Sequence, residues 1–234
     1  MEDQPSWNAK TSFIFYILLL VAILVGSIIT AMIFLGIQID PQQLAFPSAL
    51  ISLPINEAII LAITIMFAKQ NGANLKKLGL KKPTIKTIAV MSILAVFLVL
   101  LAAGISVIEE NILGPDPEGQ FLLDAILPKD SLQLIALVGI SIALVGPAEE
   151  LAFRGFIQRG FETSFGKTLG LFVSSLLFGL LHGLNSFRSI IPVTIVSLFL
   201  GYVWQKTDRN TTAVAWIHGL YDAITILLVY FAYF

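Results

Sequence analysis

Long apolar runs separated by short polar segments recur along the whole chain. A membrane-spanning helix needs about 20 mainly apolar residues, and seven runs come close to that length. They cover residues 12–37, 44–67, 87–108, 132–158, 168–186, 189–205 and 212–234. Only a short turn at residues 185–188 separates the fifth run from the sixth, which predicts a tight helical hairpin.

The composition agrees with a chain surrounded by lipid. Hydrophobic residues make up 57% of the 234 residues and charged residues only 12%, whereas soluble domains carry about 25% charged residues. We therefore expect an all-α polytopic membrane bundle that forms one domain over residues 1–234. The net charge of −1 gives no basic surface for nucleic acid, and the absence of cysteine excludes disulfides and thiolate chemistry.

The basic residues predict the orientation of the bundle. If the N-terminus is cytoplasmic, seven spans leave the C-terminus outside. Twelve of the fourteen basic residues then belong to inner segments, as the positive-inside rule requires: Lys10, Lys69, Lys76, Lys77, Lys81, Lys82, Lys86, Arg154, Arg159, Lys167, Lys206 and Arg209. The outer segments hold only Lys129 and Arg188, together with an acidic loop after the third run.

Two adjacent carboxylates and an arginine interrupt the fourth run. On a helix, Glu150 and Arg154 share a face because they are four residues apart, whereas Glu149 points about 100° away. Glu150 can therefore neutralise Arg154, and Glu149 is left without a cation nearby in sequence, available as a general base or acid. Pro147 should disturb the helix just before them. The alternative is an ordinary pair of acids at the membrane surface.

Both histidines of the chain also lie in apolar runs. His182 shares a helix face with Phe178, and His218 shares one with Asp222, each four residues apart. A carboxylate one turn away can orient an imidazole. Each histidine could instead be a buried packing residue. By helix rise, these side chains and Glu149 can meet only near the middle of the membrane, with water reaching them.

One further acid, Glu57, lies at membrane depth in the second run, close to Pro54. Because no motif surrounds it, we expect a protonated or hydrogen-bonded packing residue, with a supporting role in a site as the alternative.

Glutamate and histidine together suit hydrolysis by water. Glutamate can take a proton from water, and histidine can share that task or stabilise an oxyanion. Glu149, His182 and His218 also match the ligand types of a catalytic site for zinc or another divalent metal. The H-E-x-x-H spacing is absent, so the residues alone leave a metal and a metal-free reaction open.

Taken in order, these motifs resemble those of the CPBP intramembrane protease family, which includes the type II CAAX prenyl endopeptidases and abortive-infection or bacteriocin-processing relatives. The resemblance covers about residues 130–225. It implies that Glu149 activates water with His182 and that Glu150 supports the site beside Arg154. It also implies that His218 and Asp222 bind the oxyanion, although the anionic form of Asp222 is a poor donor for that role. Family members have been assigned both metal-dependent and metal-free mechanisms.

The resulting hypothesis is an endopeptidase of the cell membrane that cleaves a hydrophobic or lipidated peptide, including a prenylated CAAX substrate. Its partners would be membrane lipid and that substrate, and its active site would be reached from the cytoplasmic side. A proton-coupled transporter is one alternative, because intramembrane acids and histidines also form proton relays. A catalytically silent scaffold or immunity protein is another.

Overall fold

The protein is a bundle of helices, described by a computed structural model for residues 5–36 and 49–233. No strand occurs in those residues. Residues 37, 44–48 and 234 of the predicted spans lie outside them. In chain order the elements are α1 (Ala9–Gly36), α2 (Ala49–Gln70), α3 (Ile85–Leu113), α4 (Pro117–Ile126), α5 (Ser131–Ile140), the π-helix η2 (Ser141–Val145), α6 (Gly146–Glu150), the π-helix η3 (Leu151–Gln158), α7 (Arg159–His182), the 3-10 turn η4 (Phe187–Ser189), α8 (Ile190–Lys206) and α9 (Thr211–Tyr233).

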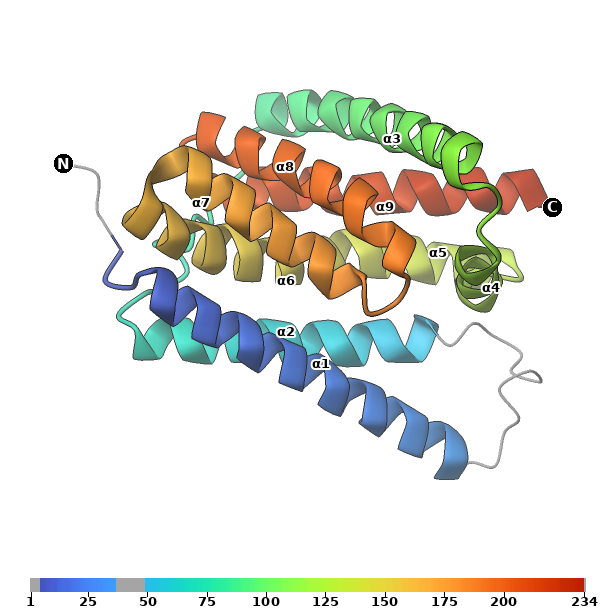
Figure 1. The fold of residues 1–234 in the computed structure, drawn as a ribbon, viewed down its shortest axis with the longest axis horizontal. Helices are drawn as coiled ribbons and strands as arrows, with labels where there is room; N and C mark the ends of the chain where they lie inside the picture. The colour runs from blue at the N-terminus through green and yellow to red at the C-terminus, as the bar shows by residue number, and fades with distance from the viewer. Residues whose placement is uncertain (1–4, 37–48, 234) are drawn as a thin grey trace.

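The spans run roughly along the long axis of the bundle (Figure 1), and the described residues contain seven of them. Within the described residues, six helical runs are long and apolar enough to cross a membrane, and one of them, Ser131–His182, has 52 residues. That run is two spans, because Gly166 interrupts it with φ 81° and ψ 167°, a conformation that favours glycine. The chain reverses there, and the second part of α7 returns beside the first (Figure 1). The predicted all-α polytopic fold is confirmed.

The two ends of the bundle differ in charge and in construction. Figure 1 places the start of α1, the α2–α3 loop, the turn at Gly166 and the α8–α9 turn at one end, with α4, the α7–α8 turn and the C-terminus at the other. The predicted basic segments therefore share an end, which we call the basic end. Arg154 is the exception: the sequence analysis counted it with the inner segments, but its side chain is buried inside the bundle.

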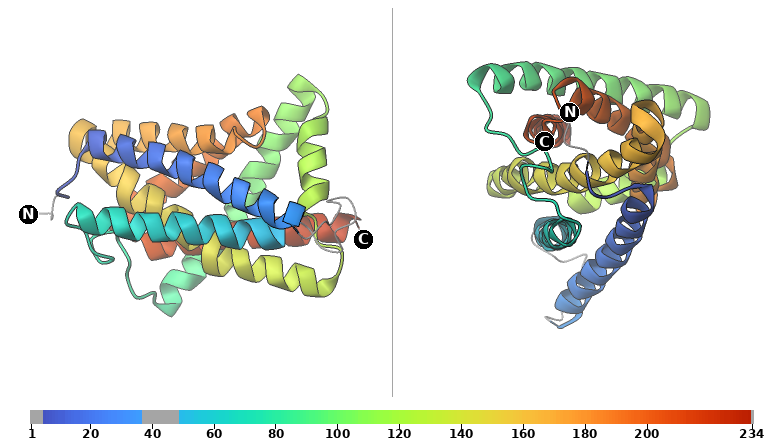
Figure 2. Two further views of the ribbon diagram at one scale, coloured as in Figure 1. Left: turned by 90° about the horizontal axis from the view of Figure 1, so that it is seen from below. Right: turned by 90° about the vertical axis from the view of Figure 1, so that its left-hand side faces the viewer.

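Helix α4 lies in the acidic loop, at the end opposite the basic end, and was not predicted. It is seen end-on in Figure 1 and from the side in Figure 2, so it lies across the direction of the spanning helices. Asp116 caps its first turn by accepting a hydrogen bond from the backbone N–H of Gly119 at 3.1 Å. Arg188 of the α7–α8 turn donates to the carbonyl oxygens of Leu113 and Gly114, at 3.1 Å and 2.8 Å, and so fixes the chain just before α4.

The predicted disturbance at Pro147 appears as two π-helical segments. Five residues of regular helix, α6, carry Pro147 and both glutamates, and π-helix precedes and follows them. Proline cannot donate a backbone hydrogen bond, and π-helical turns often occur at functional sites. Both glutamates therefore lie on a short stretch of regular α-helix, with the wider turns of a π-helix before and after it.

Helix α9 approaches η2 and α6 closely at two glycines, which brings His218 next to the glutamates. A Cβ atom on Gly146 would lie 2.5 Å from the carbonyl oxygen of Ala215 and 2.8 Å from the backbone nitrogen of Gly219. A Cβ atom on Gly219 would lie 2.7 Å from the carbonyl oxygen of Ser141. Only glycine at these positions permits this approach, as at close helix crossings in membranes generally.

The buried apolar residues form two clusters. The first gathers around Trp7, Phe15 and Phe156, and the second around Leu98, Leu200 and Trp204. Ala148, beside Glu149, belongs to the first cluster, and Ile217, beside His218, belongs to the second. The candidate site therefore lies where the two clusters meet.

Candidate active site

Glu150 and Arg154 form a fully buried ion pair. Nη1 of Arg154 donates to Oε1 of Glu150 at 2.8 Å, and the side chains of Arg154 and Glu150 are 2% and 0% exposed. Nη2 of Arg154 donates to the carbonyl oxygen and the hydroxyl oxygen of Ser197, at 3.0 Å and 2.9 Å. The guanidinium also lies 4.9 Å from the ring centre of Phe178. Arg154 thus links α8 to the helix that carries the glutamates, which is the bracing role that its spacing from Glu150 predicted.

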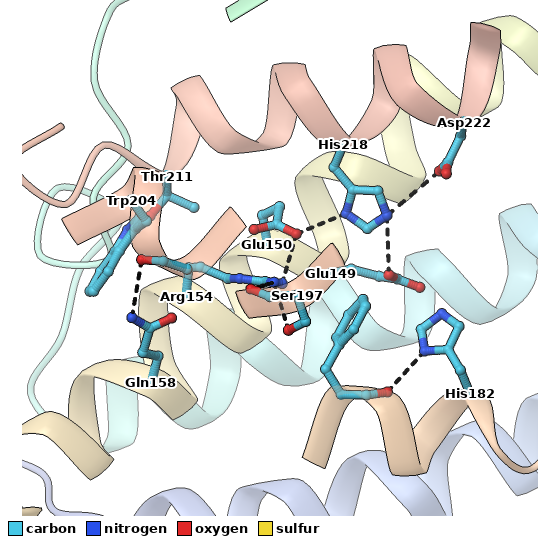
Figure 3. Close-up of polar contacts among 12 residues, drawn as sticks. Glu149, Glu150, Arg154, Gln158, His182, Ser197, Trp204, Thr211, His218 and Asp222 are labelled. Carbon is cyan, nitrogen blue, oxygen red and sulfur yellow. Dashed lines mark hydrogen bonds and ion pairs between the residues drawn. The ribbon is translucent and has the colours of Figure 1, made fainter. Parts of the chain in front are cut away.

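His218 joins the pair from α9. Its Nδ1 lies 2.8 Å from Oε1 of Glu150, and its Nε2 lies 3.7 Å from Oε2 of Glu149 and 3.6 Å from Oδ2 of Asp222. Both ring nitrogens face carboxylates, so each can serve as a donor (Figure 3). The structure therefore places His218 at the centre of three acids, a role that sequence spacing showed only for Asp222.

Glu149 points away from Arg154, as its position on the helix predicted. Its side chain is 12% exposed. Its Oε2 is buried and has no hydrogen-bond partner among the described residues. Oε2 of Glu150 is unpartnered in the same way, but Oε1 of that acid is held by Arg154 and His218, whereas Glu149 approaches only Nε2 of His218, at 3.7 Å. Glu149 is therefore the less constrained of the two acceptors.

His182 ends α7 and lies against Phe178. Its ring centre is 4.6 Å from that of Phe178, which is in turn 6.0 Å from the ring of His218. Nδ1 of His182 lies 3.0 Å from the carbonyl oxygen of Phe178. Because a carbonyl oxygen only accepts, Nδ1 carries the proton of a neutral ring and Nε2 is left as an acceptor. Figure 3 shows this ring turned toward the carboxylate of Glu149.

Three residues near the site lay outside the sequence motifs or were given another role. Ser197 holds Arg154 from α8, and Phe178 separates the two histidines. Glu57 of α2 is 4% exposed, its Oε2 has no hydrogen-bond partner in the described part of the chain, and it interacts electrostatically with Glu149, His218 and Asp222. An acid three residues after Pro54 inside an apolar run was the available signal for Glu57.

The predicted metal ligands are not grouped as a metal site. Across residues 5–36 and 49–233, no group of three or more His, Asp and Glu side chains could hold a metal ion. In each histidine Nδ1 is held, by Glu150 in His218 and by a backbone carbonyl in His182, so only Nε2 of each ring remains for another ligand. As placed, Glu149, His182 and His218 are not gathered around a common position for a zinc ion or another divalent metal.

A cavity reaches the site from the end that holds α4. Its volume is about 510 Å³, and its wall includes residues of α2, α4, α5 and α9. Asp222 and Tyr221 line it at the level of the site, whereas Leu123 and Pro128 line it near α4. Most of the wall is apolar, with polar side chains such as Asn56 and Ser141 among the apolar ones, as in many ligand sites.

Comparison with known proteins gives one family. The family model described as "Type II CAAX prenyl endopeptidase Rce1-like" matches residues 131–224. No curated protein and no solved structure gives a significant match. The matched segment begins at the first residue of α5, ends inside α9, and contains Glu149, Glu150, Arg154, His182, His218 and Asp222. Residues 131–224 of the chain are therefore similar to the Rce1-like family of type II CAAX prenyl endopeptidases, which agrees with the resemblance of its motifs to the CPBP group.

Proposed function

We propose that this protein is an intramembrane endopeptidase that hydrolyses a peptide bond in a hydrophobic or prenylated substrate. One observation supports this above all. Glu149, with an unpartnered buried oxygen, lies beside a donor nitrogen of His218 and opposite the ring of His182. An acceptor for a water proton and a donor for developing negative charge are thus within one site, as hydrolysis by water requires.

In the proposed reaction, Glu149 removes a proton from water as the water oxygen attacks the carbonyl carbon of the substrate. Nε2 of His182 is a second acceptor, because Nδ1 of that ring is held by the backbone. The tetrahedral intermediate carries its negative charge on the former carbonyl oxygen. When the C–N bond breaks, the proton held by the glutamate passes to the leaving nitrogen, and the products are an acid and an amine.

The donor for the oxyanion is Nε2 of His218. Glu150 fixes this ring through Nδ1, and Arg154 in turn holds Glu150. Asp222 lies 3.6 Å from the same Nε2. We propose that Asp222 orients the imidazole, since an ionised carboxylate cannot itself donate to an oxyanion. This assignment also accounts for an aspartate at a position where a direct donor was expected.

The surroundings of the site support a substrate that is at least partly apolar. The site lies within spanning helices, and the cavity beside it has a mainly apolar wall. A peptide with hydrophobic side chains or a lipid group fits this wall. With the basic end in the cytoplasm, the protein would cross the cell membrane with its N-terminus inside.

The test is cleavage of hydrophobic and prenylated CAAX peptides by purified protein in lipid. Glu149→Gln keeps the size of the side chain but removes the base, and His182→Ala removes the second acceptor. We expect Glu149→Gln to lower kcat by about 10²–10⁴-fold, with an unchanged unfolding temperature. Leu228→Ala, a change on the lipid-facing surface of α9, is the control. Cleavage at the wild-type rate by both site variants would contradict the proposal.

A further inference from the structure

Helix α2 places an acid on the face that packs into the bundle. Its buried residues are Ala49, Glu57, Ile60, Thr64 and Ala68, and the spacing of three or four residues from Glu57 onward defines one helix face. Within α2, Glu57 is the only ionisable residue on this face, and it is 4% exposed. A buried polar group without a hydrogen bond is costly, so packing alone does not explain an acid at this position.

The unpartnered oxygen of Glu57 lies among the charged groups of the site. Its Oε2 is buried and has no hydrogen-bond partner in the described residues, and the same is true of Oε2 of Glu149. Glu57 interacts electrostatically with Glu149 of α6 and with His218 and Asp222 of α9. Because α2 packs against α6, two carboxyl groups on adjacent helices each leave a buried oxygen without a donor in the same part of the bundle.

In the described part of the chain, no cation on a neighbouring element is paired with Glu57. The segments that pack against α2 are α1, α5, η2, α6 and η3. Neither α5 nor η2 has an ionisable residue, and Arg154 of η3 is already paired with Glu150 of α6. On α1, Lys10 is exposed at the start of the helix and Tyr16 is a phenol. Glu57 is therefore buried without a counter-ion of its own.

The cations of the site are taken up by the other three acids. Arg154 pairs with Glu150, whose Oε1 also lies 2.8 Å from Nδ1 of His218. Nε2 of His218 lies 3.7 Å from Glu149 and 3.6 Å from Asp222. A fourth ionised acid would be an unpaired charge in a buried position, which is very costly. When carboxyl groups share such a site, one of them keeps its proton, and Glu57 is the acid that no cation holds.

From these observations we propose that Glu57 is a further residue of the reaction: a protonated carboxyl whose O–H dipole stabilises the ionised form of Glu149. The proposal rests on the function proposed above, in which Glu149 removes a proton from water. In this role Glu57 does not touch the substrate and gives up no proton. It is a positioning residue that acts through Glu149, and it lies outside residues 131–224, the segment that the family model matches.

Two substitutions of similar size separate this role from packing. Glu57→Gln keeps a donor and cannot ionise, whereas Glu57→Leu removes every polar atom of the side chain. The leucine variant also removes an unpartnered buried oxygen, so its unfolding temperature should equal or exceed that of the wild type. For a hydrophobic peptide, we expect Glu57→Leu to lower kcat about tenfold or more with an unchanged KM, and Glu57→Gln to keep most of kcat.

A packing role gives a different result, because leucine suits a buried helix face and would leave cleavage intact. Full activity of Glu57→Leu would therefore overturn the proposal. A loss of kcat in Glu57→Gln as large as that in Glu57→Leu would overturn it too. If Glu57→Leu does not fold, Glu57→Met repeats the measurement with an unbranched side chain. Glu110→Gln, the same chemical change at an exposed position near the end of α3, is the matched control.

Infrared spectroscopy tests the proton on Glu57 without any cleavage. The C=O stretch of a protonated carboxyl is separate from the bands of carboxylates and amides, and it shifts in D₂O. The spectrum of the wild type minus that of Glu57→Gln should contain one such band, whereas subtraction of Glu110→Gln should give none. Absence of the band would overturn the proposal. If the wild type cleaves no peptide, the proposed function fails, and the band still decides whether Glu57 holds a proton.

Discussion

Oε1 of Glu150 is shared by two partners, Nη1 of Arg154 at 2.8 Å and Nδ1 of His218 at 2.8 Å. One carboxylate oxygen therefore joins α9 to the helix that carries both glutamates, and through Arg154 it is also linked to α8. Glu150 is held in place through this one oxygen, whereas no hydrogen bond of this kind holds its neighbour Glu149. The predictions below follow from this division between the two acids.

Removal of Arg154 should destabilise the bundle strongly. Arg154→Ala leaves Glu150 buried without its cation and leaves the carbonyl oxygen of Ser197 without its donor. Breaking a buried ion pair by removing one partner costs about 3–5 kcal/mol. Thermal unfolding in detergent measures the loss, with the exposed Lys82→Ala as the control. If Arg154→Ala unfolded at the same temperature as the wild type, the ion pair would not be needed for the stability of the fold.

Asp222 should act through His218. An asparagine at this position can still accept a hydrogen bond from Nε2 of the imidazole, whereas an alanine cannot. We expect Asp222→Asn to keep most of kcat, and Asp222→Ala to lose about 10²-fold, the scale typical of a misplaced catalytic group. Steady-state kinetics on a hydrophobic peptide distinguish the two variants. Equal losses in both would indicate that the negative charge, not the orientation of the ring, is what matters.

The close approach of α6 and α9 should be essential to the site. In Gly146→Val, the added atoms overlap the carbonyl oxygen of Ala215, which a Cβ would approach to 2.5 Å. Overpacking of this kind costs about 1–3 kcal/mol, and it moves His218 away from Glu149. Gly139→Val, seven residues earlier where nothing lies within 4 Å, is the matched control. Cleavage should be lost only in Gly146→Val, and equal activity in both variants would argue against this contact.

Cleavage should not depend on a bound metal ion. The described residues provide no group of three acid or histidine side chains that could hold a metal, and the reaction proposed here uses only side chains and water. Activity should therefore survive treatment with a chelator followed by its removal. Loss of activity that added Zn²⁺ restores would show that Glu149, His182 and His218 rearrange into a metal site.

The sequence predicted those features that depend on neighbours along the chain. Spanning helices can be recognised because hydrocarbon requires long apolar runs, and the pairing of Glu150 with Arg154 follows from helix geometry alone. The contact between Glu150 and His218 joins residues 68 positions apart, so no local rule reveals it. The position of Glu57 beside the site, which the sequence left as an alternative to a packing role, likewise depends on contacts between helices far apart in the chain.

Two local features also escaped prediction. Helix α4 has only 10 residues, too few to stand out as a span, and its amphipathic pattern lies within an acidic loop. The π-helical segments around α6 arise where Pro147 removes a donor and the chain has several ways to satisfy the freed carbonyls. Which of these it adopts depends on the packing of α9, which a single sequence does not show.

The first residues of the chain have a practical consequence for experiments. Trp7 is 2% exposed, stacks on Phe156 with ring centres 4.7 Å apart, and donates through Nε1 to the carbonyl oxygen of Phe156 at 2.9 Å. This indole is inserted into the protein near the basic end of the bundle. Trimming the chain past Trp7, or attaching a bulky affinity tag directly before it, would remove or loosen this packing against Phe156. Purification handles for this protein are better placed after α9.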